Sequence, residues 1–183
     1  MKHDIFSTPV WHIEGSPQHL VDELYNKALT LKEFHKVKED GLTRSNQGGY
    51  QTEQFDWSNF HPEGINYINK KVYEEFNHPF KIMGWWYNIN PQGSWNRAHN
   101  HPGSDFALVW YLTDSHRCLY LMSPFFQTNK LRGGEPVNPN SKKGDIIIFP
   151  GDLVHYVMPN LQETDRVCIS MNLDLQVLHL LVY

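Results

Sequence analysis

The chain has 183 residues and a formal net charge of −4, with acidic and basic residues interspersed and no run of lysine or arginine. This length predicts one domain, and the charge pattern excludes an electrostatic footprint for nucleic acid or an anionic membrane. The cysteines Cys118 and Cys168 stand far apart in apolar segments, where we expect buried, reduced thiols. The N-terminal residues lack the apolar core of a signal peptide, and no segment has the length of a membrane span, so we expect a cytoplasmic protein.

The first part of the chain, residues 1–79, is expected to be mainly helical support. Residues 5–13 predict a short edge strand. A helix is predicted over residues 17–34, and a second over residues 62–76. Apolar residues recur at helical spacing in both segments: Leu20, Leu24, Ala28 and Leu31 in the first, and Ile65, Ile68, Val72 and Phe76 in the second.

Residues 40–57 form a polar, glycine-bearing stretch, DGLTRSNQGGYQTEQFDW, which predicts a surface loop or an irregular hairpin. Loops of this kind often carry functional residues. Two interpretations stay open at this point. The stretch is either a plain connection or a lip over a pocket, in which Asn46, Tyr50 and Gln51 touch a substrate.

From Phe80 onward the pattern changes to short strands separated by Pro, Gly, Asn and Asp turns. Helices followed by strands favour a mainly β architecture with flanking helices. We expect one domain, residues 1–183, with a double-stranded β-helix (a cupin-like jelly roll) built from residues 80–183 and the N-terminal helices packed on one sheet. The apolar tail VLHLLVY, residues 177–183, is either an outer strand or the edge of a homodimer.

Two histidines are separated by one residue, in the stretch NRAHNHPGSDF. In an extended strand alternate side chains share a face, so His99 and His101 can point into the same cavity. A third histidine, His155, follows the turn in FPGDLV and could fold back beside this pair. The pair alone is a weak signal for a metal. The three together predict a facial iron site with open positions on its other side.

Arg166 begins RVCISMN, a strand whose remaining residues are mostly apolar. A guanidinium in that setting requires an anion, because it cannot lose its charge. A bound carboxylate would supply one. A salt bridge to nearby acidic residues is equally compatible with the sequence, and three candidates lie close along the chain: Asp165, Asp174 and Glu163.

Taken together, these motifs resemble the 2-oxoglutarate- and Fe(II)-dependent oxygenases, in a branch related to prolyl hydroxylases. HNHPGS followed by VWYL is similar to that branch's H-x-H-P-x-S stretch and its aromatic-rich strand. DIIIFPGDLVHYVMPN resembles the strand and turn that precede the distal histidine, and RVCISMN resembles the arginine-led last core strand. Even SNQGGYQT, residues 45–52, is similar to the family's N-terminal loop.

The resemblance implies Fe(II), 2-oxoglutarate and O2 as cofactors and cosubstrates. His99 and His155 match the first and the distal iron ligand. Arg166 matches the residue that grips the far carboxylate of 2-oxoglutarate, with Tyr111 assisting. The other expected contacts are Asn88 or Asn90 on the opposite wall, Asn172 on the face of Arg166, and, toward the substrate, Trp95, Ser104 and Asp105 beside Asn46, Tyr50 and Gln51.

The chain departs from the wider superfamily at His101, where most members have Asp or Glu. A third imidazole could bind the metal there and would leave the ion its full double charge. Alternatively His101 is an outer hydrogen-bond partner while water takes the position, or Asp105 folds back across the Pro-Gly turn. Cys168 stands where relatives often have a serine, so a hydrogen bond to the cosubstrate there is in doubt.

The implied activity is hydroxylation coupled to decarboxylation of 2-oxoglutarate to succinate. The substrate would be a protein or peptide side chain, a prolyl ring being the family-based expectation, or a small metabolite. Two other readings stay open: a cupin-like three-histidine dioxygenase that does not use 2-oxoglutarate, and a non-catalytic jelly-roll binding module. Candidates for an aromatic wall around the metal are Trp86, Trp95, Phe106 and Trp110.

Overall fold

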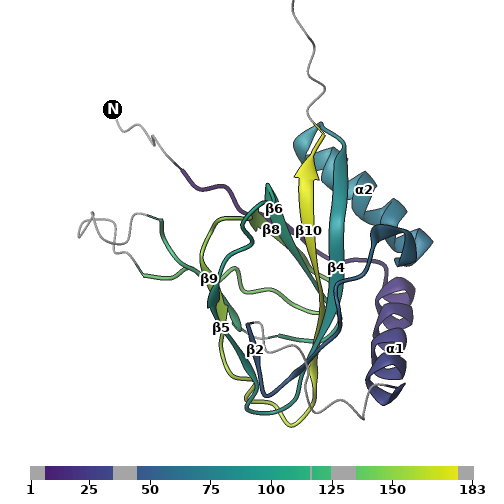
Figure 1. The fold of residues 1–183 in the computed structure, drawn as a ribbon, viewed down its shortest axis with the longest axis vertical. Helices are drawn as coiled ribbons and strands as arrows, with labels where there is room; N and C mark the ends of the chain where they lie inside the picture. The colour runs from purple at the N-terminus through teal and green to yellow at the C-terminus, as the bar shows by residue number, and fades with distance from the viewer. Residues whose placement is uncertain (1–6, 35–44, 116, 125–134, 177–183) are drawn as a thin grey trace, which may run out of the picture.

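The computed structural model describes residues 7–34, 45–115, 117–124 and 135–176, which form two antiparallel β-sheets and two helices (Figure 1). The larger sheet contains, in spatial order, β1 (Trp11–Ile13), β8 (Ile146–Pro150), β6 (Phe106–Tyr111), β10 (Arg166–Leu175), β4 (Phe80–Asn90) and β3 (Tyr50–Gln51). The smaller sheet contains β2 (Asn46–Gln47), β5 (Trp95–His99), β9 (His155–Val157) and β7 (Leu119–Leu121). The sheets face each other without closing into a barrel, which is the predicted double-stranded β-helix.

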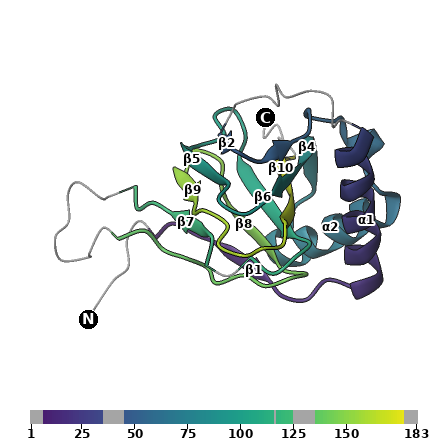
Figure 2. The ribbon, with the colours of Figure 1, turned by 90° about the horizontal axis from the view of Figure 1, so that it is seen from below.

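Both predicted helices are present, as α1 (Gln18–Phe34) and α2 (Pro62–Phe76). A short 3-10 segment, Trp57–Asn59, precedes α2. They lie together on the outer face of the larger sheet, on the side away from β5 and β9 (Figure 2). The start of α2 is fixed by His61, whose Nδ1 accepts a hydrogen bond from Gly64 N at 3.4 Å. Neither helix has the length and apolar character needed to cross a membrane, among the residues described.

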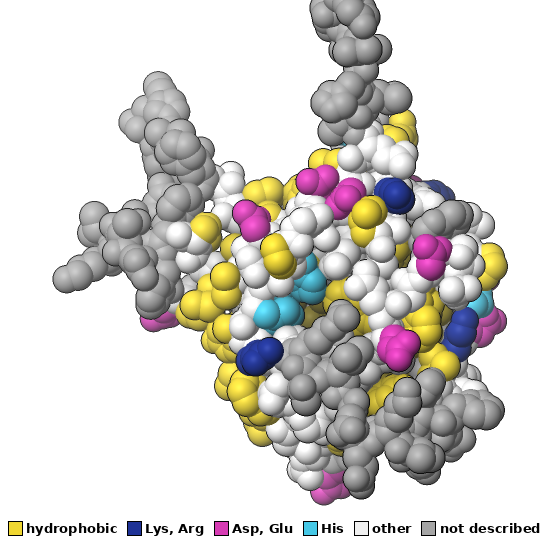
Figure 3. All heavy atoms as spheres, in the orientation of Figure 1, with side chains coloured by type: hydrophobic (Ala, Val, Ile, Leu, Met, Phe, Trp, Pro, Cys, Tyr) yellow, Lys and Arg dark blue, Asp and Glu magenta, His cyan; other side chains and the backbone are white. Residues whose placement is uncertain are grey.

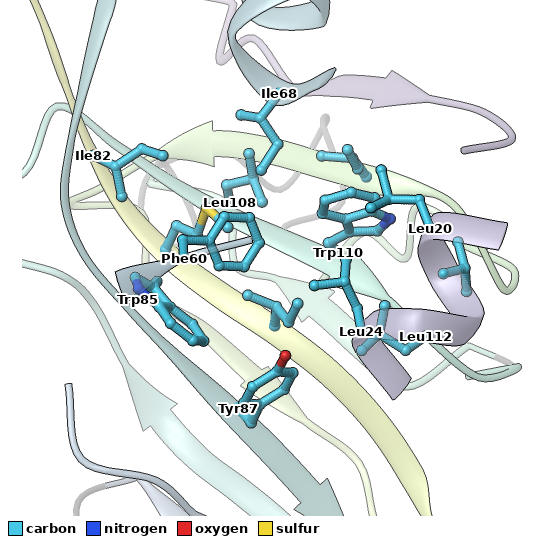
Figure 4. Packing of buried hydrophobic residues seen from close by; sticks show 14 of the residues in the cluster. Leu20, Leu24, Phe60, Ile68, Ile82, Trp85, Tyr87, Leu108, Trp110 and Leu112 are labelled. Carbon is cyan, nitrogen blue, oxygen red and sulfur yellow. The ribbon is translucent and has the colours of Figure 1, made fainter. Parts of the chain in front are cut away.

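The main hydrophobic core lies between these helices and the larger sheet, as Figure 4 shows. Alternate residues of β4 supply its floor, because successive strand side chains point to opposite faces. Trp85 and Tyr87 face Leu24 and Ile68 in this layer, and all four are at most 2% exposed. Burying one such aliphatic side chain contributes about 1.5–3 kcal/mol, so this layer holds the helices in place.

The opposite face of the same strands is polar and points toward the smaller sheet. In the antiparallel pairing of β10 with β4, Arg166 lies opposite Asn90 and Cys168 opposite Asn88. Two-residue alternation therefore separates an apolar face toward the helices from a polar face between the sheets. The side chains that share the polar face are Trp86, Asn88 and Asn90 of β4 and Arg166, Cys168, Ser170 and Asn172 of β10.

The N-terminal part contains the predicted short edge strand, as β1 at one edge of the larger sheet. The stretch predicted as a loop or irregular hairpin forms a hairpin at residues 46–51, which places β2 in the smaller sheet and β3 in the larger one. In its described part this hairpin is built into both sheets and does not form a lip. The beginning of the predicted loop, residues 40–44, and the apolar tail, residues 177–183, lie outside the described residues.

A candidate metal centre and its pocket

The predicted histidines come together at one end of the space between the sheets. His99 ends β5 and His155 begins β9, and the two residues are direct partners in the strand pairing. His101 follows in the next turn. One ring nitrogen of each residue lies within 4.8 Å of the others, so a single ion could contact all three. We call His99, His101 and His155 the histidine cluster.

Backbone contacts between two turns hold His101 beside His155. The N–H of His101 donates to the carbonyl of Gly151 at 2.7 Å, and the N–H of Gly151 donates to the carbonyl of Asp105 at 2.9 Å. A side chain at Gly151 would not fit, since a Cβ there would lie 2.1 Å from the carbonyl oxygen of Ser104. Gly151, which precedes His155 in the chain, therefore also holds His101 in place.

Two rings of the histidine cluster are oriented by their own backbone. His99 Nδ1 lies 2.8 Å from the carbonyl oxygen of Arg97, and His155 Nδ1 lies 2.9 Å from that of Leu153. Each Nδ1 donates its hydrogen to the carbonyl, which leaves Nε2 with a free lone pair. Such an outer hydrogen bond is the usual support of a metal-binding histidine, because it fixes both the tautomer and the ring direction.

Burial keeps the cluster neutral at pH 7. It lowers the pKa of His155 to about 3 and that of His101 to about 4, and it lowers the pKa of His99 as well. No carboxylate of the described residues opposes these shifts. By contrast, His12 and His19 each lie 2.8 Å from a carboxylate oxygen, of Asp145 and Glu63 respectively. Neutral imidazole is the form that binds a transition metal.

A pocket adjoins the cluster and runs between the two sheets. It holds about 560 Å³ of space free of protein atoms, the part open to solvent included. Histidine side chains reach the surface near the middle of the face seen in Figure 3, close to the position of β5 and β9 in Figure 1. The polar and charged side chains in its lining are Ser45, Asn88, Asn90, Asn96, His99, His101, Tyr111, Cys118, His155, Arg166, Cys168 and Ser170.

Arg166 lines the pocket and is 4% exposed. Its Nη1 donates to the carbonyl of Met158 at 3.1 Å, whereas Nη2 is buried without a hydrogen-bond partner among the described residues. The predicted alternative of a salt bridge is wrong for Asp165 and Asp174. The carboxylate of Asp165 pairs with Lys32 at 2.5 Å, and that of Asp174 accepts the N–H of Asp105 at 3.3 Å. A buried guanidinium with an open N–H group is a site for an anion.

Asn88 and Asn90 lie beside Arg166 on the same face of the larger sheet and not on an opposite wall, and their hydrogen bonds resolve the choice between them. Both amide ends of Asn90 are occupied, since its Oδ1 accepts from Asn46 at 2.7 Å and its Nδ2 donates to Asn96 at 3.2 Å. Asn88 donates from Nδ2 to Ser170 at 2.9 Å, but its Oδ1 is buried without a partner among the described residues. The geometry favours Asn88 as the residue with a polar group still available to a ligand.

Tyr111 and Cys168 complete this end of the pocket as neutral groups. Burial raises the pKa of Tyr111 well above its usual value and that of Cys168 to about 12. The phenol of Tyr111 also interacts with the side chains of Ser141 and Cys118. It can therefore act as a hydrogen-bond donor but not as a base near neutral pH.

The hairpin residues predicted to touch a substrate do not reach the pocket. Asn46 uses its amide to tie Asn90 and the backbone of Gly49, the latter at 3.1 Å. Tyr50 packs against the core on the helix side, and Gln51 is buried outside the pocket lining. The hairpin divides between the two sheets, which is why these three side chains lie outside the pocket lining.

The other three predicted substrate contacts also lie elsewhere. Trp95 is 43% exposed, because strand alternation turns it outward while Asn96 points in. Ser104 and Asp105 belong to the turn after His101 and are not in the lining. The carboxylate of Asp105 accepts the N–H of Leu175 at 2.8 Å, so it does not fold back toward the histidine cluster.

Of the predicted aromatic wall, only Trp86 lines the pocket, with its ring stacked on His101 at a centroid distance of 5.7 Å. Phe106 and Trp110 face the core on the helix side. Sequence reasoning overlooked several lining residues, which the alternation within β5, β7 and β10 would have identified: Asn96, Leu119 and Ser170.

Residues 84–172 match the model of a family described as "Putative 2OG-Fe(II) oxygenase". That stretch contains the histidine cluster and Arg166. No curated protein matches the sequence of the chain. Solved structures do match its fold.

One such structure is a prolyl-4-hydroxylase from Pseudomonas putida, with 12% identity, a TM-score of 0.64 and coverage of 92% of this chain and 93% of that one. A second is a viral collagen prolyl hydroxylase from Paramecium Bursaria Chlorella virus-1 in a 2-oxoglutarate complex, with 18% identity, a TM-score of 0.60 and coverage of 90% and 94%. A third is HygX from Streptomyces hygroscopicus with nickel and 2-oxoglutarate bound, with 12% identity, a TM-score of 0.63 and coverage of 91% and 83%.

Identities this low establish the fold alone, and the fold is the predicted one. The family match covers the strands and turns that form the pocket, including the H-x-H pair, the distal histidine and the arginine-led strand. Residues 84–172 therefore match the model of the 2-oxoglutarate- and Fe(II)-dependent oxygenase family, and the chain has the fold of solved prolyl hydroxylases.

Proposed function

We propose that the chain is an Fe(II)- and 2-oxoglutarate-dependent dioxygenase that hydroxylates its substrate while 2-oxoglutarate is decarboxylated to succinate. The observation that carries this proposal is the position of Arg166. Its open, buried guanidinium lines the same pocket as three neutral, mutually close histidines. One end of the pocket is thus suited to a metal and the other to a carboxylate.

The donor set fits Fe(II). Imidazole nitrogens are common ligands of iron, and a facial set of three leaves the remaining positions open to other ligands. His101 takes the place of the carboxylate found in most relatives. Because all three ligands are neutral, the ion keeps both positive charges, which strengthens its attraction for the oxoacid end of 2-oxoglutarate. The bound metal, with O2 and 2-oxoglutarate, would supply the oxidising chemistry.

The residues of the chain would bind and orient the reactants. Arg166 offers its open N–H to the far carboxylate of 2-oxoglutarate, a geometry that guanidinium matches well. Asn88 and the phenol of Tyr111 flank that position in the lining. Apolar side chains at the pocket floor, among them Leu119 and Met171, exclude water from it. The complexes of HygX and the viral hydroxylase contain 2-oxoglutarate, which supports the same assignment here.

The substrate class is the less constrained part of the proposal. Two of the matched structures are prolyl hydroxylases, and another is HygX with hygromycin B bound. A prolyl side chain of a protein or peptide and a small metabolite are therefore both candidates. Of the lining side chains, Trp86 stacks on His101 and is available to a substrate, whereas both amide ends of Asn96 are bonded, to Asn90 and to Ser45.

A cupin-like dioxygenase that does not use 2-oxoglutarate is the second candidate, because the ligand set has three histidines and no carboxylate. Such an enzyme has no need for a buried arginine with an open N–H group. The effect of replacing Arg166 on 2-oxoglutarate binding therefore distinguishes the two candidate functions.

The test is an anaerobic titration of Fe(II)-loaded protein with 2-oxoglutarate, followed by the visible metal-to-ligand charge-transfer band. We expect a band in the wild type and an affinity for 2-oxoglutarate that falls roughly 10- to 150-fold in Arg166→Gln, the equivalent of about 1.5–3 kcal/mol for a charged hydrogen bond. Iron binding without a band would favour the cupin-like candidate.

Arg97→Ala is the matched control. Arg97 is exposed, lies outside the pocket lining, and is close enough to His99 for its charge to lower the pKa of that histidine. If Arg166 acts through direct contact, the control keeps its affinity. Equal losses in both variants would mean that only net positive charge matters, and would contradict the assigned role of Arg166.

A further inference from the structure

A glycine interrupts β4 close to the histidine end of the pocket. Gly84 lies two residues before Trp86, so the two positions share the pocket side of the strand. The pairing of β4 with β10 shifts register next to it, and Met83 is the extra residue. A glycine inside a strand often marks a place where another group approaches closely, and such bulges are common beside active sites. The strand is therefore shaped around something that lies on Gly84.

The group that lies on Gly84 is the side chain of Gln54. A Cβ added to Gly84 would overlap Nε2 of Gln54 and would lie 2.7 Å from its Cδ and Cγ. The end of the glutamine side chain thus rests on the backbone of β4, in space that any residue other than glycine would fill. Asn172, the predicted cosubstrate contact, lies opposite Gly84 on β10 and outside the pocket lining.

The backbone around Gln54 is fixed by the larger sheet. The next residue, Phe55, exchanges two backbone hydrogen bonds with Trp85, of 2.8 and 3.1 Å. The rings of Phe55 and Trp85 pack at a centroid distance of 4.8 Å on the helix side of the sheet. Successive side chains of an extended segment point to opposite faces, so Gln54 points to the pocket side. Its position is set by strand pairing and not by a free loop.

The amide of Gln54 is available to a ligand. The side chain is exposed and has no hydrogen-bond partner among the described residues. It offers two N–H donors and a carbonyl acceptor on the same side of β4 as Trp86, whose ring is stacked on His101 at a centroid distance of 5.7 Å. Among the described residues that line the pocket, none is Lys, Asp or Glu, and Arg166 is already assigned to 2-oxoglutarate. A substrate near Trp86 therefore meets neutral partners.

We propose that Gln54 orients the substrate: its amide forms hydrogen bonds with a neutral amide group of the substrate, whose adjoining part lies on Trp86 and extends toward the histidine cluster. A primary amide is best matched by a group that both donates and accepts, as a peptide bond or a carboxamide does. Gly84 is the seat that makes this position possible. The inference rests on the proposed function and narrows its substrate class.

The test is a nuclear magnetic resonance titration of isotope-labelled protein loaded with 2-oxoglutarate and with Zn(II), a metal without redox chemistry. The probes are a blocked tripeptide, acetyl-Ala-Pro-Ala-methylamide, and propionamide, a carboxamide without a peptide bond. We expect the side-chain amide signals of Gln54, identified by their loss in Gln54→Leu, to shift. A shift with the tripeptide alone assigns the contact to a peptide bond, and a shift with propionamide extends it to any carboxamide. No shift with either probe overturns the inference.

Two variants remove the contact in different ways. Gln54→Leu keeps the size of the side chain without the amide, and Gly84→Ala keeps the glutamine but fills its seat. Each should bind the recognised probe roughly 2- to 10-fold more weakly, the range for one neutral hydrogen bond. The double variant should lose no more than Gln54→Leu alone, because the alanine acts through the glutamine. Additive losses would contradict the role of Gly84 as a seat.

Gln18→Leu is the matched control, since it makes the same exchange on α1, at the helix side of the larger sheet. It should bind the probe as the wild type does. Melting curves verify folding, and Gln54→Asn, whose amide reaches less far, replaces Gly84→Ala if that variant does not fold.

These outcomes separate the inference from the function on which it rests. Gln54→Leu should keep the wild-type affinity for 2-oxoglutarate, because Gln54 is not part of the pocket lining. If the metal-loaded wild type binds no 2-oxoglutarate, the proposed function itself fails. If it binds 2-oxoglutarate and Gln54→Leu binds the probe as tightly as the wild type, the function stands and the role of Gln54 is rejected.

Discussion

At the scale of single residues, the site is marked by buried polar groups that lack a hydrogen-bond partner within the described protein. Arg166, Asn88 and Asn172 each have a buried polar atom without a hydrogen-bond partner among the described residues. Buried polar groups are normally paired, and Gln51, Tyr87 and Trp110 also have such an atom outside the pocket, so only Arg166 and Asn88, which line the pocket, point to an absent ligand. By contrast, the amide oxygen and nitrogen of both Asn46 and Asn90 are hydrogen-bonded, so these two asparagines are structural by the same criterion.

The lowered pKa values of the cluster predict a dependence of stability on pH. The unfolded chain takes up protons on His101 and His155 near pH 6.5, whereas the folded protein does so only near pH 4 and pH 3. Unfolded molecules therefore bind more protons in this window, and the free energy of unfolding of the metal-free protein falls as the pH drops from 6.5 toward 4.

Denaturant unfolding of metal-free protein at pH 7, 6, 5 and 4 measures this effect, for which about 1.4 kcal/mol per pKa unit is the upper limit. In His155→Gln one of the responsible groups is gone, so its stability should decline less steeply with acid. Parallel slopes in the variant and the wild type would show that His155 already titrates normally in the folded state.

The replacement of a carboxylate by His101 predicts a change in cosubstrate binding. His101→Asp restores the ligand type of most relatives and lowers the net charge of the bound metal site by one. Fe(II) should still bind, while 2-oxoglutarate should bind several-fold more weakly because its anionic end meets less positive charge. Calorimetric titration of the Fe(II)-loaded variant under anaerobic conditions checks this; unchanged or tighter binding would argue that His101 is not a ligand.

At the scale of elements, strand pairing sets His99 beside His155, and two turns set the position of His101. The turn at residues 101–105 and the turn at Gly151 are joined by two backbone hydrogen bonds, of 2.7 and 2.9 Å. Gly151→Ala would place a methyl group against the carbonyl of Ser104, and one of the turns must move. We expect a loss of stability of about 1–3 kcal/mol and weaker Co(II) binding, because His101 and His155 move apart.

Asp152→Ala is the control for this variant, since Asp152 is the exposed next residue of the same turn. It should retain both stability and Co(II) affinity in thermal melts and metal titrations. A Gly151→Ala protein that binds Co(II) as the wild type does would refute the role given to this turn.

The elements also show what sequence patterns can and cannot predict. Apolar spacing gave the bounds of α1 and α2 almost to the residue, because each helix packs one stripe on the sheet. The histidine cluster and Arg166 could be predicted from residue type. Closely spaced histidines indicate a metal, and an arginine in an apolar strand costs free energy unless it meets an anion. The hairpin at residues 46–51 could not be placed, because the division of β2 and β3 between two sheets depends on strand partners far away in the chain.

At the scale of the whole molecule, the larger sheet separates stability from chemistry. One face carries the helices and the main core, and the other faces the pocket and the smaller sheet (Figures 1 and 2). Leu24 of α1 is completely buried in the core and contributes nothing to the pocket lining. Mutations in the core between the helices and the larger sheet should therefore change stability without changing binding in the pocket.

Leu24→Ala tests this separation. It should lower the free energy of unfolding by about 2–5 kcal/mol, the range for truncating a buried leucine, without changing the Co(II) affinity of the folded protein. Unfolding curves and a metal titration at a temperature where the variant remains folded give both quantities. A parallel loss of metal affinity would mean that the helices and the metal centre are coupled through the sheet.

The most direct test of the central claim is an anomalous difference map, at the iron edge, of crystals grown anaerobically with Fe(II) and 2-oxoglutarate. We predict one iron peak within bonding distance of a ring nitrogen of each of His99, His101 and His155, with the far carboxylate of 2-oxoglutarate on Arg166. Iron bound by another set of residues, or 2-oxoglutarate bound away from Arg166, would contradict the account.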